Sequence, residues 1–159
     1  MSLESAKNHL ARWGRDGDVL EFEVSSATVD LAAKALRVEP ARIAKSLGFK
    51  APEGALILVT AGDTRVDNKA FKATFGFKAK LLSPEETLAA TGHAVGGVCP
   101  FGLPETGLTV YLDASMRRFR TVFPACGSAN SAIELTCDDL FAYAGATAWV
   151  TVCTMPKEP

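Results

Sequence analysis

The segment from Gly92 to Pro104 contains the residues that are best suited to chemistry. Its thirteen residues include four glycines and two prolines and carry almost no charge. Glycine weakens helices and strands, and proline lacks the backbone donor that both need, so we predict a loop held against the body of the protein. Its backbone N–H groups could then approach a phosphate, or a carbonyl that becomes an oxyanion. Composition alone favours the simpler alternative, a buried turn between two strands.

Lys45 is the second residue that could do chemistry. It lies in a stretch where Ile43, Leu47 and Phe49 are expected to enter the core, and β-type alternation places the lysine on their side. Two interpretations remain open. The ammonium group could reach the surface on its apolar stem, or it could stand at the rim of a pocket and meet a phosphate or a carbonyl.

Cys99 and His93 suggest a different chemistry, a thiol nucleophile with a histidine base. No third residue that would orient the base is evident, so the alternative is that Cys99 forms part of a pocket wall. His93 would then border the pocket and select the size of its occupant, or satisfy a local backbone group. Cys126, beside Gly127, is typical of a small buried residue.

The remaining composition excludes several classes of protein. The four cysteines (Cys99, Cys126, Cys137 and Cys153) form no closely spaced pair and there are two histidines, so we expect reduced thiols, no metal centre and no cofactor. The glycine spacing matches neither a dinucleotide-binding nor a phosphate-loop fingerprint. The net charge of −1 means that nucleic acid could be bound only through a local patch.

The length of 159 residues fits a single domain over 1–159, with its core at about 20–152. The apolar runs are too short to cross a bilayer and the first residues do not begin a signal peptide, so we expect a cytoplasmic protein without membrane contact. Helices are predicted at 5–13, 29–36, 67–75, 83–91 and 137–143, with caps at Thr28, Asp67 and Ser83. Strands are predicted at 19–24, 42–50, 55–61, 77–82, 108–112, 119–125, 131–136 and 148–152. This order indicates a mixed α/β or α+β domain around a curved sheet.

Three segments together resemble the YbaK/ProX aminoacyl-tRNA deacylases, relatives of the editing domain inserted in bacterial prolyl-tRNA synthetases. They are residues 29–47, the segment from Gly96 to Gly102, and residues 125–140. The resemblance implies an α/β fold with a curved or barrel-like mixed sheet flanked by short helices. It also implies hydrolysis of the ester that joins a wrong amino acid to tRNA, by a free-standing, trans-editing protein.

The resemblance assigns the family's key lysine to Lys45 and its glycine–proline loop to the segment from Gly96 to Pro100. We hypothesise that the backbone N–H groups of Gly97, Val98 and Cys99 polarise the ester carbonyl. Lys45 would anchor the terminal adenosine through phosphate or ribose; as a general base it would need a strongly lowered pKa. The expected substrate-binding residues are His93, Gly96, Pro100, Phe101, Gly127 and Ser128.

The partner implied by the resemblance is aminoacyl-tRNA, with a synthetase as a further possibility; the oligomeric state is open. The expected substrate is a small amino acid such as alanine, cysteine or serine on proline tRNA. Candidates for tRNA contact, each equally typical of a solvated face, are Lys69, Lys72, Lys78, Lys80, Arg117, Arg118 and Arg120. Two alternatives are a non-catalytic module that binds aminoacyl-tRNA or a synthetase, and a small-molecule ester or thioester hydrolase that uses Cys99.

Overall fold

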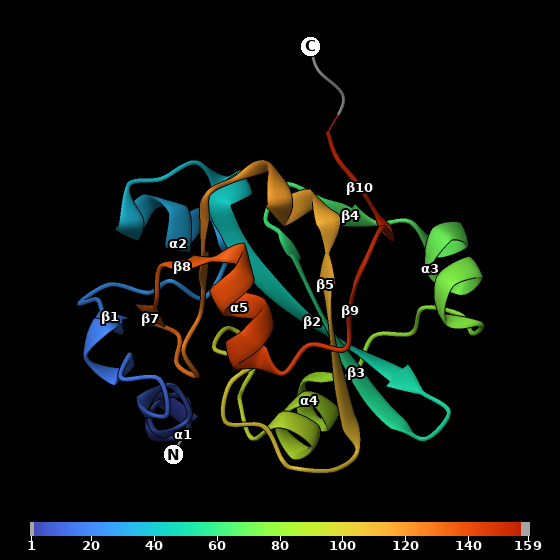
Figure 1. Ribbon diagram of the computed structural model, residues 1–159, viewed down its shortest axis with the longest axis horizontal. Helices are drawn as coiled ribbons and strands as arrows, with labels where there is room; N and C mark the ends of the chain where they lie inside the picture. The colour runs from blue at the N-terminus through green and yellow to red at the C-terminus, as the bar shows by residue number, and fades with distance from the viewer. Residues whose placement is uncertain (1, 157–159) are drawn as a thin grey trace.

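A six-stranded mixed sheet with the strand order β8–β6–β2–β3–β5–β9 forms the centre of the computed structural model, which describes residues 2–156 (Figure 1). Its strands are β2 Ile43–Ala51, β3 Gly54–Ala61, β5 Leu108–Asp113, β6 Thr121–Pro124, β8 Leu135–Thr136 and β9 Ala148–Val150. β2 and β3 form an antiparallel hairpin, whereas β5, β6 and β9 join the sheet in parallel. The predicted curved mixed sheet is therefore confirmed.

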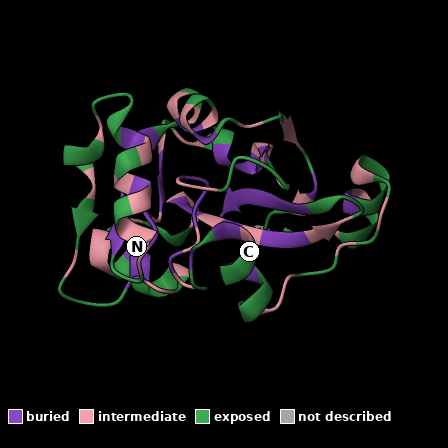
Figure 2. Cartoon of the chain, turned by 90° about the horizontal axis from the view of Figure 1, so that it is seen from below, coloured by how far each residue is buried: buried purple, intermediate pink, exposed green. Residues whose placement is uncertain are grey.

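The hairpin is the most buried part of the sheet because its residues are apolar on both faces. Ile57 and Val59 of β3 lie on one face with Leu112, under helices α1 (Ser2–Ala11) and α5 (Cys137–Ala144). Leu58 faces the other way, toward Phe71 of helix α3 (Asn68–Phe75). Figure 2 shows that buried residues follow the strands, while the helices turn their exposed sides outward. A continuous apolar run is typical of a strand covered on both faces.

The helices begin where the sequence predicts caps. The Thr28 hydroxyl accepts from Leu31 N at the start of α2 (Val29–Leu36), and Asp67 caps α3. Ser83 and Glu86 form a complete capping box on α4 (Pro84–Thr91). These side chains satisfy backbone donors that have no partner inside the helix. α2 buries Ala32 and Ala33, whereas Leu31 is exposed.

Several strand predictions were wrong in extent. Residues 77–82 form no strand but a single bridge to β2, since Lys78, Lys80 and Leu81 are exposed and little apolar surface is buried. The predicted strand 131–136 is divided into β7 (Ser131–Ala132) and β8, which pair with different partners. The strand expected at 19–24 shrinks to β1 (Leu20–Glu21), and the last predicted strand stops at Val150.

A second small sheet pairs β4 (Arg65–Val66) with β10 (Cys153–Thr154), beyond the end of β3. Short 3-10 turns stand at Asp16–Asp18, Pro40–Arg42 and Ala114–Arg118. In the part of the chain that the structure describes, no helix is long and apolar enough to cross a membrane.

The glycine loop packs directly against the second small-residue loop. A Cβ atom on Gly97 would lie 2.7 Å from Ser128 N and 2.8 Å from Gly127 C. Gly127 has φ +86°, and a Cβ there would lie within van der Waals distance of the backbone of Ser2 at the start of α1. Backbone therefore touches backbone at both places, which only glycine permits.

His9 fastens α1 to two other parts of the chain. Its Nε2 donates to Tyr143 O over 2.5 Å, and its Nδ1 serves as an acceptor, so the ring is neutral. That nitrogen accepts from Gly102 N at 3.1 Å and from the Arg12 guanidinium at 2.6 Å. Burial lowers the pKa of His9, and the nearby Arg12 charge lowers it further. The neutral imidazole thus joins α1, α5 and the glycine loop.

We expect acid to loosen this junction. Because the folded-state pKa of His9 lies below its ordinary value, the unfolded chain takes up the proton first, and the contribution is complete above about pH 6.5 and is lost as the pH falls below it. The free energy of unfolding in urea should therefore be higher at about pH 7.5 than at about pH 5.5, with the loss occurring below about pH 6.5. His9→Gln should be less stable at the higher pH and show a shallower pH dependence. The pKa of His93, the other histidine, is also lowered. The free energy of unfolding of the double variant His9→Gln/His93→Gln should therefore depend even less on pH. An unchanged slope in His9→Gln would contradict this account.

Gly97→Ala should destabilise the protein, because the new Cβ has to push the two loops apart. Overpacking of this kind costs about 2 kcal/mol, and for a chain of this size lowers Tm by roughly 4–8 °C. Gly17→Ala is the matched control, since a Cβ there meets nothing within 4 Å. Thermal unfolding of the two variants measures the difference. Equal Tm values would mean that the loops separate freely.

Candidate functional site

A pocket of about 210 Å³ opens between α2, β2, the end of β6 and the glycine loop. Most of its wall is apolar and made of small or branched side chains. The lining residues are Ser26, Ala27, Thr28, Val29, Ala32, Ile43, Ala44, Lys45, Ser46, Leu47, Val95, Gly96, Val98, Phe123, Ala125, Ser131 and Ala132. Lys45 is the one charged residue in this wall. The pocket can therefore hold a small, largely apolar group beside a single cation.

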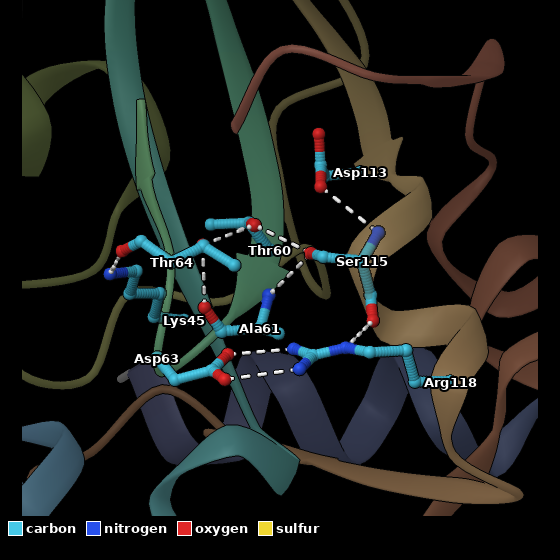
Figure 3. A network of polar contacts seen from close by, with 8 residues as sticks. All are labelled: Lys45, Thr60, Ala61, Asp63, Thr64, Asp113, Ser115 and Arg118. Carbon is cyan, nitrogen blue, oxygen red and sulfur yellow. Dashed lines mark hydrogen bonds and ion pairs between the residues drawn. The ribbon is translucent and has the colours of Figure 1, made fainter. Parts of the chain in front are cut away.

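Lys45 is half-buried and its ammonium group is fixed by the backbone. Nζ donates to Thr64 O over 2.5 Å, in the turn that follows β3 (Figure 3). Burial lowers the pKa of Lys45 below its ordinary value; the charge of Arg65 adds to this, and that of Asp63 opposes it. A half-buried ammonium with one carbonyl partner retains donors for an oxygen of a ligand.

A polar network keeps the Thr64 turn in place (Figure 3). The Thr64 hydroxyl bonds Ala61 O and the Thr60 hydroxyl, which lies 3.2 Å from Ser115 Oγ. Asp113 Oδ2 accepts from Ser115 N, and its Oδ1 accepts from Val152 N. These buried groups are mutually satisfied, so they fix the carbonyl that holds Lys45.

Arg118 supports the same turn and is not a free surface cation. Its guanidinium forms two hydrogen bonds to the Asp63 carboxylate, of 3.1 and 2.7 Å, and a third to Ser115 O. The pair lowers the pKa of Asp63. This occupied geometry argues against the predicted tRNA contact of Arg118, because a bidentate pair leaves few donors for phosphate.

The glycine loop reaches the pocket with only part of its length. Gly97 N donates to Ala94 O at 3.0 Å, so this N–H closes a turn. Contrary to the prediction, it is not available for an oxyanion. Val98 lines the pocket, and its N–H has no partner among the described residues. Gly96 also lines it, with φ +100° and Ala27 close by. Val98 is therefore one of the donors that the loop leaves available at the pocket.

His93, Cys99 and Phe101 lie behind the pocket wall and are fully buried. His93 Nε2 lies 2.7 Å from Phe101 O and must donate to it, because a carbonyl can only accept. This bond ties the two ends of the loop together. The structure thus places His93 as a partner of a backbone group and not beside the occupant of the pocket.

Cys99 is poorly suited to act as a nucleophile. Burial raises the pKa of its thiol to about 12. The sulfur lies 3.5 Å from His93 Nε2, but that nitrogen carries the proton shared with Phe101 O and cannot accept another. The other ring nitrogen, Nδ1, has no hydrogen-bond partner among the described residues. A thiolate needs a base or a positive environment, and neither is found here.

Of the other predicted substrate-binding residues, Pro100, Gly127 and Ser128 do not line the pocket but support its wall. Pro100 and Gly127 are buried, and Ser128 donates to Ser131 Oγ over 2.6 Å. Ser131 itself lines the pocket. The predicted loops are brought together, as Gly97 and Ser128 show, but they touch the cavity through few residues.

The predicted basic residues divide between two regions. A hollow of about 270 Å³ beside α3 is lined by Lys69, Lys72 and Lys78. Lys80, two residues after Lys78, is exposed. Arg117 is exposed and stacks on Trp149 at 5.0 Å. α3 lies at the opposite end of the molecule from α2 and β8 (Figure 1).

A larger groove of about 690 Å³ lies beside β6 and β8, and we call it the arginine groove. Its lining residues are Arg15, Arg42, Arg118, Phe119, Arg120, Thr121, Glu134, Thr136 and Asp139. Arg42 pairs with Glu134 and stacks at 5.0 Å on Phe123, whose ring lines the pocket. Arg120 is exposed and has no partner among the described residues. The groove and the pocket therefore share a wall.

The sequence did not indicate Ser46, Thr64 or Asp63 as parts of the site. The sequence carries no signal for Thr64, because Thr64 holds Lys45 through its own backbone carbonyl in a turn. Ser46 follows Lys45 directly and was readable as a polar residue inside a buried strand. Among the described residues, no group of three histidine, cysteine or acidic side chains could hold a metal ion.

Comparisons with known proteins agree on one family. The model of the aminoacyl-tRNA editing domain matches residues 23–143. An uncharacterized Bacillus subtilis protein, YwhH, is 54% identical over 157 residues, which is 96% of this chain and 98% of that protein. A proline–tRNA ligase of a Geobacillus species is 29% identical over 102 residues, which is 64% of this chain but 18% of the ligase.

A solved structure gives the same result for the fold. It belongs to a protein proposed to be a trans-editing enzyme for prolyl tRNA synthetase, with a TM-score of 0.86 and 30% identity. The alignment covers 96% of this chain and 97% of that one. With most of the chain matched by the family model and the whole architecture shared, this protein belongs to the aminoacyl-tRNA editing domain family.

Proposed function

We propose that this protein hydrolyses the ester between a small, wrongly attached amino acid and tRNA, with proline tRNA as the acceptor. The observation that carries the proposal is the small apolar pocket with Lys45 as its one cation and no cysteine or histidine in its wall. Membership of the editing family supports the reaction class. The likeness to a proline–tRNA ligase and to a proposed prolyl trans-editing protein supports the choice of tRNA.

The size and lining of the pocket favour a short side chain. The pocket has a volume of about 210 Å³. Ala27, Val29, Ala32 and Phe123 offer apolar contacts to a methyl-sized group. Alanine, cysteine and serine fit this description.

The chemistry requires little beyond positioning and polarisation, because an aminoacyl ester is already reactive. The Val98 N–H donates to the ester carbonyl and stabilises the developing oxyanion. The Lys45 ammonium, held by Thr64 O, binds a phosphate or ribose oxygen of the terminal adenosine. Water attacks the carbonyl carbon, the bond to the ribose oxygen breaks, and the ribose hydroxyl leaves with a proton. The neighbouring ribose hydroxyl orients the water.

The thioesterase alternative is disfavoured by Cys99 itself, since its thiol is buried, has a pKa of about 12 and lacks a base. A non-catalytic binding module would have the same pocket, and only turnover distinguishes it from an enzyme. The decisive measurement is therefore hydrolysis.

Lys45→Ala should lower kcat/KM for hydrolysis by about 100-fold, the size expected when a positioning group is lost. The assay uses alanyl, cysteinyl, seryl and prolyl esters on proline tRNA and on the cognate tRNAs. We expect one or two small-residue esters to be cleared by the wild type and not by the variant.

Lys50→Ala is the control for this variant, because Lys50 lies on the same strand but outside the pocket, where it pairs with Glu86. It should retain wild-type hydrolysis. Binding of charged tRNA without turnover would favour the non-catalytic module. Activity lost in Cys99→Ala but kept in Lys45→Ala would favour the thioesterase.

Phosphates of the acceptor stem are proposed to follow the arginine groove, because it adjoins the pocket and Arg120 is unpaired there. Arg120→Gln should raise Kd for tRNA several-fold and reduce the slope of log Kd against log salt by about one. Lys72→Gln, from the distant lysine cluster, is the comparison. If Lys72→Gln weakens binding and Arg120→Gln does not, the tRNA contacts the α3 end instead.

A further inference from the structure

The edge of β2 that faces the pocket has a gap at Ser46. Pairing with β6 ends at Ala44 and Pro124. Backbone bonds on the same edge resume at Gly48, whose carbonyl accepts from Leu82 N, and at Lys50, whose N–H donates to Lys80 O. Ser46 lies between these two regions, and the structure records no strand partner for it on that edge.

The backbone of Ser46 faces this gap. In a strand, successive residues direct their N–H and C=O groups to alternate edges. Gly48 and Lys50 use theirs toward residues 80–82, so Ser46, two residues earlier, presents its own N–H and C=O to the same edge. Lys45 directs its backbone groups to the opposite edge, toward Thr60 of β3. An unpaired donor and acceptor thus stand at the pocket.

The side chain of Ser46 adds a third polar group. Ser46 is 9% exposed, lines the pocket, and its Oγ has no hydrogen-bond partner among the described residues. The other hydroxyls of the lining are already bonded: Ser26 to Ala129 O, Thr28 to Leu31 N and Ser131 to Ser128. A buried polar group without a partner is costly and rare in native proteins. Ser46 therefore stands out as a group whose partner comes from outside the chain.

We propose that Ser46 forms the subsite for the α-amino group of the aminoacyl ester, through its Oγ and its backbone carbonyl. The inference rests on the proposed deacylase function and specifies how the substrate is oriented. An ammonium group needs acceptors, and no carboxylate lines the pocket, so hydroxyl and carbonyl oxygens must serve. Lys45 cannot contribute, because it carries the same charge.

The two neighbouring residues thereby orient the substrate. Adjacent residues of a strand place their side chains on opposite faces, so Lys45 and Ser46 approach the pocket from different sides of β2. The amino group lies against Ser46, and the ester and the adenosine lie toward Lys45. The carbonyl is thus presented to Val98 in one orientation, which favours esters of α-amino acids over simple acyl esters.

The test compares alanyl-tRNA with propionyl-tRNA, which has hydrogen in place of the α-amino group and keeps the methyl group and the ester. Each enzymatic rate is divided by the uncatalysed rate of the same ester, which removes the difference in intrinsic reactivity. The wild type should prefer the alanyl ester. Ser46→Ala should reduce this preference by about tenfold, the size of one hydrogen bond to a charged group, by slowing the alanyl ester only.

Ser46→Ala should keep or slightly raise Tm, because it removes a buried hydroxyl without a partner. Ser26→Ala is the matched control: Ser26 also lines the pocket, but its Oγ is bonded to Ala129 O. Whatever its effect on the overall rate, Ser26→Ala should keep the wild-type preference between the two esters.

An equal loss on both esters, or no loss at all, in a folded Ser46→Ala variant would overturn the subsite and leave the deacylase function intact. If the wild type hydrolyses neither ester faster than the uncatalysed reaction, the proposed function fails and the subsite fails with it. These two failures are distinguished by the wild-type rate alone.

Discussion

The contact between Gly97 and the Gly127–Ser128 backbone is the constraint on which the rest of the site depends. Neither loop has regular hydrogen bonding of its own, so each takes its shape from the other and from α1, whose first residues rest on Gly127. This close packing of backbone brings Val98 to the pocket wall and places Cys99 behind it. A side chain at Gly97 would separate the loops and move the N–H of Val98, which has no partner among the described residues. The hydrogen bond from His93 Nε2 to Phe101 O joins the two ends of the glycine loop.

Lys45 illustrates how the fold prepares a charge in advance. Burial disfavours its ammonium form, and a single carbonyl, Thr64 O, compensates in part. That carbonyl is fixed by hydroxyl groups of Thr60 and Ser115 and by the Arg118–Asp63 pair, so the cation is held before any substrate arrives. A fixed, partly desolvated charge interacts more strongly with an oxygen than a solvated one does. The polar network beside β3 is therefore part of the site although it does not touch the cavity.

Much of the fold was readable from the sequence because local signals and burial agreed there. The caps at Thr28, Asp67 and Ser83 and the apolar run of β3 each specify an element through their own chemistry. The strand predicted at 77–82 failed because half of its residues are exposed and the segment meets β2 in a single bridge. The site was predicted only in part. Lys45, Gly96 and Val98 line the pocket, but Gly97 uses its N–H in a local turn with Ala94 O, and the burial of Cys99 depends on contacts between distant segments. A linear pattern identifies the loop but not which of its atoms reach the cavity.

The gap in β2 connects the fold to the proposed function. An unpaired strand edge usually invites association with another chain, and proteins cover such edges. Here α2 and the glycine loop cover the gap without filling it, so the free N–H, C=O and hydroxyl of Ser46 stay enclosed beside an apolar wall. A peptide strand could not enter so small a space, but one amino acid residue could. An amino acid ester carries the donor and the acceptor that a strand residue presents, at similar spacing. The interruption that weakens the sheet at this point therefore has the dimensions and the polarity of a site for a single aminoacyl group.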